Sequence, residues 1–285
     1  LYKVIKLEVK DSTRAVELAG NLADNAILYA AILNSDHERW SQFGEAAQAD
    51  LSNLIMLGID RLRPITLAIS HWDDKKRAEF QKALYYLVCA SVRILIASPA
   101  PGQVFEQRIS KVAPLVSNGT IKTAKDLAAR MNVEIVPSDV AFRDAFKTAR
   151  VSQPYLARYY LRALENAQDA GNNHPARVTK DDILGTLEHI LPDKPSGAWS
   201  HITLDIAKAY VNRIGNLALL KERDNSMAGN ADFLTIKVPI YKAEKVFHLT
   251  KSVGNCTAKW DVDLIEARQK ELANFAVKTW PITVK

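Results

Sequence analysis

Apolar residues recur every three to four positions through the first half of the chain, the spacing that places them on one face of an α-helix. Asp73 or Asp74 is a suitable N-cap for one of these segments, and Ser138 for another. No sustained alternation of apolar and polar residues, the mark of a half-buried strand, occurs before residue 147. We therefore expect a helical N-terminal domain over residues 1–147. The pattern predicts helices over residues 16–33, 40–57, 73–97, 104–116, 123–131 and 138–150.

The pattern changes in the second half of the chain. Residues 183–191 and 214–220 are short apolar runs of strand length. Asp261 is placed to cap a long final helix. We expect a mostly α-helical protein whose second domain, residues 148–285, is a small α+β module. The spacing of apolar residues in this domain predicts helices over residues 153–168, 204–213, 225–237 and 261–280.

Composition limits the class of protein without identifying it. The net charge of +6 permits a nucleic-acid partner, and the two cysteines, Cys89 and Cys256, are too far apart for a metal site. This cysteine usage and the lack of a visible signal peptide are typical of a cytoplasmic protein. The longest apolar run, residues 83–97, is short for a membrane span and is interrupted by Arg93. We expect it to be a buried helix, with no membrane partner.

Three segments of the second domain combine residue types that can cut a phosphodiester bond. A neutral imidazole can take a proton from water near neutral pH, and carboxylate and amide oxygens suit a hard divalent ion. Asn225 follows Asn216 by nine residues. The three segments are Glu188-His189-Ile190-Leu191-Pro192, Asn216-Leu217-Ala218-Leu219-Leu220 and Asp224-Asn225-Ser226.

This set resembles the ββα-metal nucleases, also called HNH or His-Me finger nucleases. It resembles in particular the C-terminal nuclease domain of GmrSD-type modification-dependent restriction endonucleases, over about residues 150 to 285. That domain has Glu-His-Ile-x-Pro, a following Trp, Ile-Gly-Asn-Leu-x-Leu-Leu, Asn-Ser, Phe-x-x-Lys and Trp-Pro. The corresponding residues here are 188–192, Trp199, 214–220, Asn225-Ser226, Phe233 with Lys237 four residues later, and Trp280-Pro281.

The resemblance implies a ββα-metal core wrapped by helices and a metal-dependent DNA endonuclease. His189 would be the general base, and Asn216 would hold or orient its ring. Glu188 and Asn225 would hold a divalent ion, Mg²⁺ or Mn²⁺. The scissile phosphate would be contacted by Arg213 or Lys237.

Glu188 poses a geometric problem, because neighbouring residues on a regular strand point to opposite faces. Either the strand is bulged between Glu188 and His189, or Glu188 is not a direct ligand. Asp193 and Asp224 are the carboxylates that could take its place.

The resemblance also implies a role in restriction of modified foreign DNA. In this family a ParB-like nucleotide-binding domain usually precedes a helical region, and residues 1–147 resemble that region. The chain begins at Leu1 without an initiator methionine, so we expect an upstream ParB-like domain or subunit as a partner, besides DNA. The alternative is a non-catalytic DNA- or protein-binding module on a nuclease-like scaffold.

Overall fold

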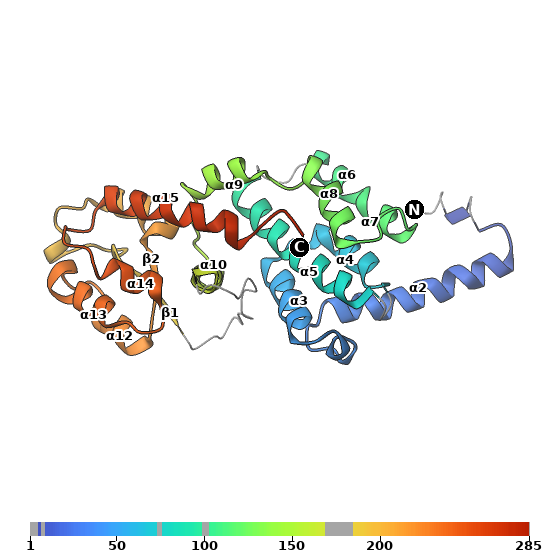
Figure 1. Ribbon diagram of the computed structural model, residues 1–285, viewed down its shortest axis with the longest axis horizontal. Coiled ribbons are helices and arrows are strands. Elements are labelled where there is room, and N and C mark those ends of the chain that lie inside the picture. Colours follow the sequence, from blue (N-terminus) through green and yellow to red (C-terminus); the bar gives the residue numbers. More distant parts are fainter. Residues whose placement is uncertain (1–4, 7–8, 73–75, 99–102, 169–184, 285) are drawn as a thin grey trace.

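A computed structural model of the chain describes residues 5–6, 9–72, 76–98, 103–168 and 185–284. Within these residues the protein is mostly helical, with one small two-stranded sheet, so the predicted mostly α class with a small strand-containing module is confirmed (Figure 1). The first half contains α2 (Ser12–Ile32), α3 (Glu45–Leu57), α4 (Arg63–Ile69), α5 (Arg77–Ala97), α6 (Gln103–Ser110), α7 (Val112–Ser117), α8 (Ala124–Glu134) and α9 (Asp139–Phe146). The second half contains α10 (Pro154–Gln168), β1 (Thr186–His189), α11 (Leu204–Tyr210), β2 (Leu217–Leu220), α12 (Glu222–Ala228), α13 (Val238–Ala243), α14 (His248–Val253) and α15 (Val262–Thr279).

Several helix ends follow from local capping. Thr123 precedes α8 and forms a capping box with Asp126, in which each side chain accepts a hydrogen bond from the other residue's backbone N–H. Ser138 caps α9, as predicted. The cap predicted at Asp73 or Asp74 lies outside the described residues.

Some predicted helices are shorter or interrupted in the structure. Gly44 has φ +85° and separates a 3₁₀ turn, Glu38–Phe43, from α3, because this backbone region suits glycine. The segment predicted over residues 225–237 is divided between α12 and a π-helical turn, Phe233–Lys237. Helices α4, α13 and α14 were not predicted, since six or seven residues are too few to show a helical period.

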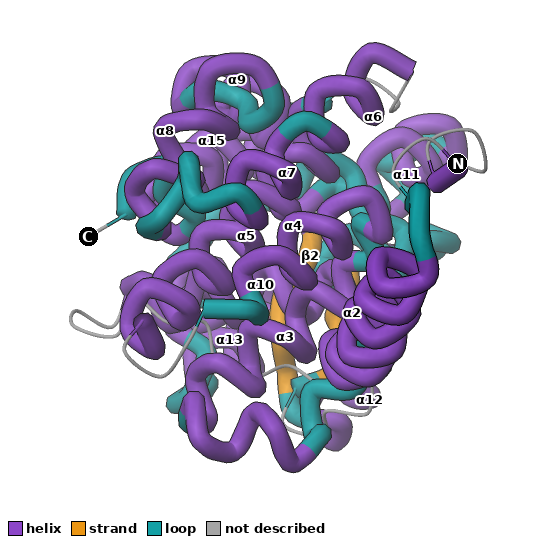
Figure 2. The backbone as a smooth tube through the Cα atoms, turned by 90° about the vertical axis from the view of Figure 1, so that its right-hand side faces the viewer, coloured by secondary structure: helices purple, strands orange, loops and turns teal. Residues whose placement is uncertain are grey.

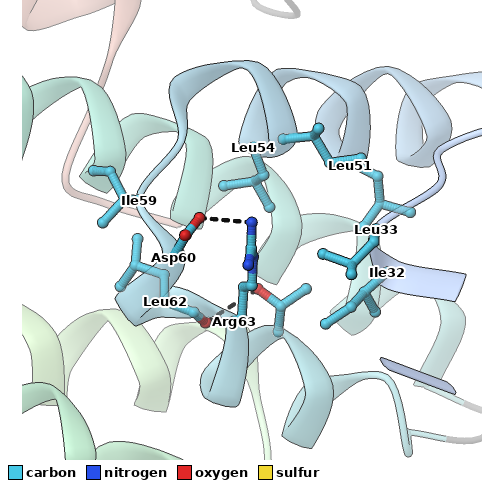
Figure 3. A pocket seen from close by; sticks show the side chains of 10 residues that line it. Ile32, Leu33, Leu51, Leu54, Ile59, Asp60, Leu62 and Arg63 are labelled. Atoms are coloured by element: carbon cyan, nitrogen blue, oxygen red, sulfur yellow. Dashed lines mark hydrogen bonds and ion pairs between the residues drawn. The ribbon is translucent and has the colours of Figure 1, made fainter. Parts of the chain in front are cut away.

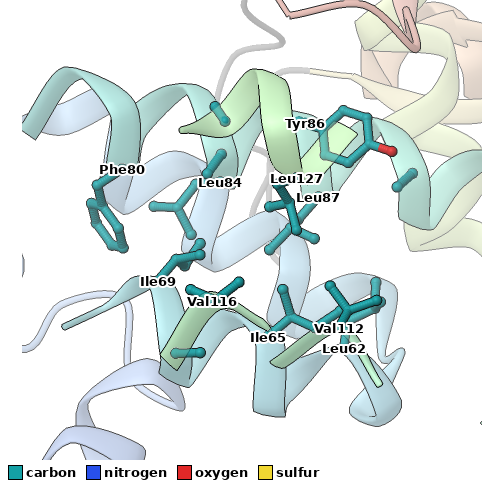
Figure 4. Close-up of a cluster of buried hydrophobic side chains, with 14 of the residues drawn as sticks. Leu62, Ile65, Ile69, Phe80, Leu84, Tyr86, Leu87, Val112, Val116 and Leu127 are labelled. Carbon is teal, nitrogen blue, oxygen red and sulfur yellow. The ribbon is translucent and has the colours of Figure 1, made fainter. Parts of the chain in front are cut away.

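The N-terminal bundle is organised around α5. Its side chains Phe80, Leu84 and Leu87 are fully buried among aliphatic residues of neighbouring helices (Figure 4). Burying each such side chain stabilises the fold by about 1.5–3 kcal/mol. The facing residues are Ile65 and Ile69 of α4, Val112 and Val116 of α7, and Leu127 of α8.

Helix α5 is also long and apolar enough to cross a membrane by length and composition alone. Most of it is buried inside this bundle, as expected for a core helix. Helix α2 is different, because it extends along the outside and leaves Val16 and Ile27 exposed (Figure 1). Where α2 ends, an ion pair of 2.6 Å between Arg63 and Asp60 borders a cavity of about 30 Å³, room for one water molecule (Figure 3).

The sheet consists of two antiparallel strands, which run side by side in a largely helical backbone (Figure 2). The register places Glu188 opposite Ala218 and His189 opposite Leu217. Both strands are shorter than predicted: residues 214–216 form a 3₁₀ turn before β2, and residues 183–184 lie outside the described part.

The two halves share one hydrophobic cluster. It combines Met56 of α3 and Val88 of α5 with Phe142 of α9, Leu161 of α10 and Leu272 of α15. A separate cluster fills the C-terminal module behind the sheet and includes Ala218, Leu220, Phe233 and Trp260. The predicted boundary between residues 147 and 148 therefore crosses a continuous region of packed side chains.

Residues 280–284 return to the N-terminal bundle and lie beside α5 (Figure 1). The buried Arg93 of α5 donates from Nε to the backbone carbonyl of Trp280, 2.7 Å away, and pairs with Asp139 at 2.6 Å. Asn132 of α8 donates to the carbonyl of Ile282 at 2.8 Å. These bonds hold residues 280–282 against the first half of the protein.

Candidate active site

The candidate site lies at the end of β1, where the strand register separates two neighbouring residues. The ladder from Thr186 to His189 is continuous, so no bulge interrupts it. Side chains on a regular strand alternate between faces. Glu188 therefore lies on the side of Ala218 and the C-terminal core, and His189 lies on the opposite side with Leu217.

The His189 ring is half-buried, and the side chain of Asn212 is near enough to raise its pKa. Burial lowers the pKa of this imidazole, while the nearby charges of Glu188 and Asp193 and the side chain of Asn212 raise it in part. The net effect keeps the ring neutral at neutral pH. A neutral ring can accept a proton, as a general base must.

Asn216 is fully buried, and its amide bonds to backbone groups and to an indole. Its Oδ1 accepts from the backbone N–H of Leu191 at 2.8 Å and from the indole of Trp260 at 3.0 Å. Its Nδ2 donates to the carbonyls of Leu191 and Val211. Asn216 therefore holds the backbone just after β1 in place, and the amide that influences the His189 pKa belongs to Asn212.

Glu188 and Lys237 bind each other. The Lys237 ammonium donates to Glu188 Oε1 at 2.8 Å and to the carbonyls of His189 and Ile190 at 3.0 and 2.9 Å. Tyr241 also donates to Glu188 Oε1, at 2.7 Å. Both charged groups are almost completely buried, and the three ammonium hydrogens are all used. This geometry speaks against Lys237 as a phosphate contact and gives Glu188 a structural partner on the side away from His189.

Arg213 is likewise engaged within the fold. Its Nε donates to Gln269 at 3.0 Å and its Nη2 to the carbonyl of Lys147 at 2.7 Å, while the guanidinium lies over the ring of Tyr210. It joins α11 and β2 to α9 and α15. The structure thus offers a packing role for the second residue predicted to contact phosphate.

Asn225 lies on α12 and contacts the start of β1. Its Nδ2 donates to Thr186 Oγ1 at 2.7 Å and to the carbonyl of Leu187 at 3.0 Å. Both amide hydrogens are therefore directed at β1, and Oδ1 is the atom that could bind a cation. These contacts lie two and three residues before His189, so they are not contacts with the imidazole.

A comparison with known proteins identifies this region. Residues 136–275 match the model of the family described as GmrSD restriction endonucleases, C-terminal domain. These residues form a GmrSD C-terminal domain. No curated protein matches the chain. The matched range begins before α9 and ends within α15.

The donor set of the GmrSD domain suits a weakly held, hydrated ion better than a closed metal site. The described residues contain no group of three or more His, Cys, Asp or Glu side chains arranged for a metal. Asp193 is exposed and lies within electrostatic range of His189, and Asp224 is half-buried on α12. Mg²⁺ fits such a site, because it keeps several waters and takes only one or two protein ligands.

Sequence reasoning missed several residues of the GmrSD domain that shape the site. Asn212 lies four positions before Asn216, outside the recognised motif, and no local signal distinguishes it from a surface asparagine. Gln269 bonds to Gly215 and to the carbonyls of Phe146 and Ala149. It lies on α15, whose sequence indicates only an amphipathic helix. Contacts such as these depend on the fold, so periodicity does not reveal them.

Proposed function

We propose that the GmrSD domain is a metal-dependent endonuclease that hydrolyses phosphodiester bonds in DNA as part of a restriction system against modified foreign DNA. The observation that carries the proposal is the half-buried His189 at the end of β1, whose pKa is lowered by burial and which Asn212 influences. Family membership supports a nuclease of the restriction-endonuclease type.

In the proposed mechanism, Nδ1 or Nε2 of neutral His189 takes a proton from the attacking water while the other ring nitrogen is held by Asn212. Asn225, through Oδ1, and Asp193 would hold the divalent ion. We prefer Asp193 to Glu188 because Glu188 Oε1 is occupied by Lys237 and Tyr241. The ion, Mg²⁺ or Mn²⁺, would supply charge stabilisation at the phosphate and leaving oxygen. Asn216 and Lys237 fix the backbone that positions His189.

The decisive experiment is cleavage of supercoiled plasmid, modified and unmodified, with Mg²⁺ or Mn²⁺ and with EDTA as the blank. His189→Ala should lose cutting by at least about a hundredfold, the usual contribution of a general base. His201→Ala is the matched control, since His201 is exposed in the same domain, and it should cut like the wild type. Equal activity of His189→Ala and wild type would reject the assignment.

The ion ligands are tested by metal titration of the same reaction. Asn225→Ala and Asp193→Asn should each raise the Mg²⁺ concentration needed for half-maximal cutting, because each removes an oxygen ligand. Glu222→Gln, on the exposed start of α12, is the control and should leave the titration unchanged. If Glu188→Gln alone shifts the titration, Glu188 leaves Lys237 to bind the ion and the preference for Asp193 is wrong.

Asn212 is proposed as a positioning residue. Asn212→Ala should lower the rate by about 10- to 100-fold, as is usual for a partner that orients a ligand or base. The pH profile distinguishes this role from a loss of stability. The acid limb of the wild type should lie below about pH 6.5, because burial lowers the His189 pKa and preserves the neutral base at lower pH. Asn212 raises the pKa of His189, so its removal should lower that pKa and move the acid limb further toward low pH.

The alternative, a binding module without turnover, makes the opposite prediction. Both the wild type and His189→Ala would bind DNA in a mobility-shift assay, and neither protein would nick DNA with Mg²⁺ or Mn²⁺.

A further inference from the structure

A second site lies far from His189, between α5 and the returning end of the chain. A cavity of about 480 Å³ opens there. Its size is in the range of small-molecule binding pockets. The residues that line it include Lys82, Tyr85 and Tyr86 from α5, and Lys278, Thr283 and Val284 from the C-terminal segment.

The walls of this cavity are held by the fold. The Tyr85 hydroxyl donates to the carbonyl of Thr279 at 3.3 Å, and the Tyr86 hydroxyl donates to Asn132 Oδ1 at 2.8 Å. Figure 4 shows Tyr86 at the edge of the aliphatic cluster, with its oxygen on the side away from Leu84 and Leu87. Asn132 in turn binds the backbone of Ile282. The site is therefore largely preformed, which reduces the entropic cost of binding.

The charge of the lining is positive. Lys82 and Lys278 contribute two ammonium groups, and none of the described residues that line the cavity is acidic. Lys278 is exposed, and Lys82 is 47% exposed with only a loose contact of 3.9 Å to Glu79. Two ammonium groups beside tyrosine rings and Val284 suit a ligand with a charged end and an apolar or aromatic body.

We propose that this cavity binds a small organic phosphate, with the phosphate between Lys82 and Lys278 and the body of the ligand against Tyr85 and Val284. The bound ligand would bridge helix α5 of the N-terminal bundle and residues 278–284, which follow the GmrSD domain, because the walls come from both. The proposal does not depend on the nuclease assignment. Free mononucleotides and the 5′-phosphate end of a DNA strand share this chemistry, and the experiment separates them.

The test uses the full 285-residue chain in metal-free buffer with EDTA, so that nuclease activity plays no part. Deoxyadenosine 5′-monophosphate is titrated by calorimetry, with inorganic phosphate and deoxyadenosine as the two half-ligands. We expect the nucleotide to bind at least tenfold more tightly than either half and to raise the melting temperature. If a 5′-phosphorylated oligonucleotide binds more tightly than the mononucleotide, the natural ligand is a DNA end. If the mononucleotide binds more tightly, the natural ligand is a free nucleotide.

Variants locate the binding. The double variant Lys82→Ala/Lys278→Ala should weaken nucleotide binding at least tenfold. Lys270 is an exposed lysine on α15, the helix that carries Lys278, and Lys270→Ala should bind the nucleotide like the wild type. Thr283→Trp should also abolish binding, by filling the cavity without changing its charge. Wild-type affinity in the double variant or in Thr283→Trp, at an unchanged melting temperature of the free protein, would overturn the proposal. Phosphate alone binding as tightly as the nucleotide would reduce the site to an adventitious anion site and overturn it as well.

Discussion

The N-terminal bundle and the GmrSD domain use buried polar groups in different ways. In the bundle, Thr66, Ser70 and Ser91 each bond to the carbonyl four residues earlier in their own helix. In the GmrSD domain, Asn216 bonds to Leu191, 25 residues away, and Gln269 to Phe146, 123 residues away. The bundle depends mostly on apolar surface, with Arg93 as its buried long-range polar link, whereas the irregular backbone around β1 depends on several side chains that satisfy distant carbonyls and amides. A domain with short strands needs such links, because its ladders supply few backbone bonds.

The largest effect expected from this contrast comes from the buried ion pair. Lys237→Met should destabilise the protein by about 4 kcal/mol, because Glu188 would remain buried without its partner. The double variant Glu188→Gln/Lys237→Met should recover much of that loss. Chemical denaturation measures both. A double variant as unstable as the single one would show that the pair itself, and not the unpaired charge, supplies the stability.

The next effect is that of Asn216. Asn216→Leu keeps the volume but leaves buried groups of Leu191, Val211 and Trp260 without their partner, and should cost about 3 kcal/mol. Unfolding in urea would measure the loss. A cost below about 1 kcal/mol would mean that water replaces the amide, and the link would then be dispensable.

Glu165 adds a pH dependence to the GmrSD domain. Burial raises its pKa to about 7, although the N–H groups of Leu249 and His248 lower it in part. The folded state therefore keeps the proton after the unfolded chain has lost it, so this contribution to stability is full below about pH 4.5 and is lost as the pH rises through about 7. We expect the stability of wild type relative to Glu165→Gln to fall by about 3 kcal/mol between pH 4.5 and 8.

Asp126, in the bundle, provides the control for this pH effect. Its carboxylate accepts bonds from Thr123 and Lys122, which lower its pKa. Its contribution is therefore present at neutral pH and lost as the pH falls, the opposite sign to Glu165. Melting temperatures of Asp126→Asn and Glu165→Gln across the same pH range should thus diverge from wild type in opposite directions. Shifts of the same sign would contradict one of the two assignments.

The smallest effect is expected in the aliphatic core. Leu87→Met should cost less than about 1.5 kcal/mol, because a flexible side chain of similar volume can fill the same space. This is the bundle's counterpart of Asn216→Leu, and both are measured by urea unfolding. A larger cost at Leu87 than at Asn216 would reverse the contrast between the two regions.

The same contrast explains what could be predicted from the sequence. The helical period and local caps such as Ser138 and Asp261 were sufficient for most long helices, because their signals lie within a few residues. Gly44 interrupts a helix through one backbone angle, which periodicity does not register. The motif predicted the GmrSD domain, which the family match confirms, and led to His189 as the candidate base. It did not reveal what Asn216 and Glu188 contact, since their partners are brought close only by the fold.

The bond from Arg93 to the carbonyl of Trp280 has a consequence for synthesis on the ribosome. The buried guanidinium of α5 lacks one of its acceptors until residue 280, 187 positions later, has also emerged. During that interval the cation must remain hydrated, so the packing of α5 against the shared cluster stays incomplete. The bundle is therefore expected to complete its packing only after the GmrSD domain that follows it has been synthesised.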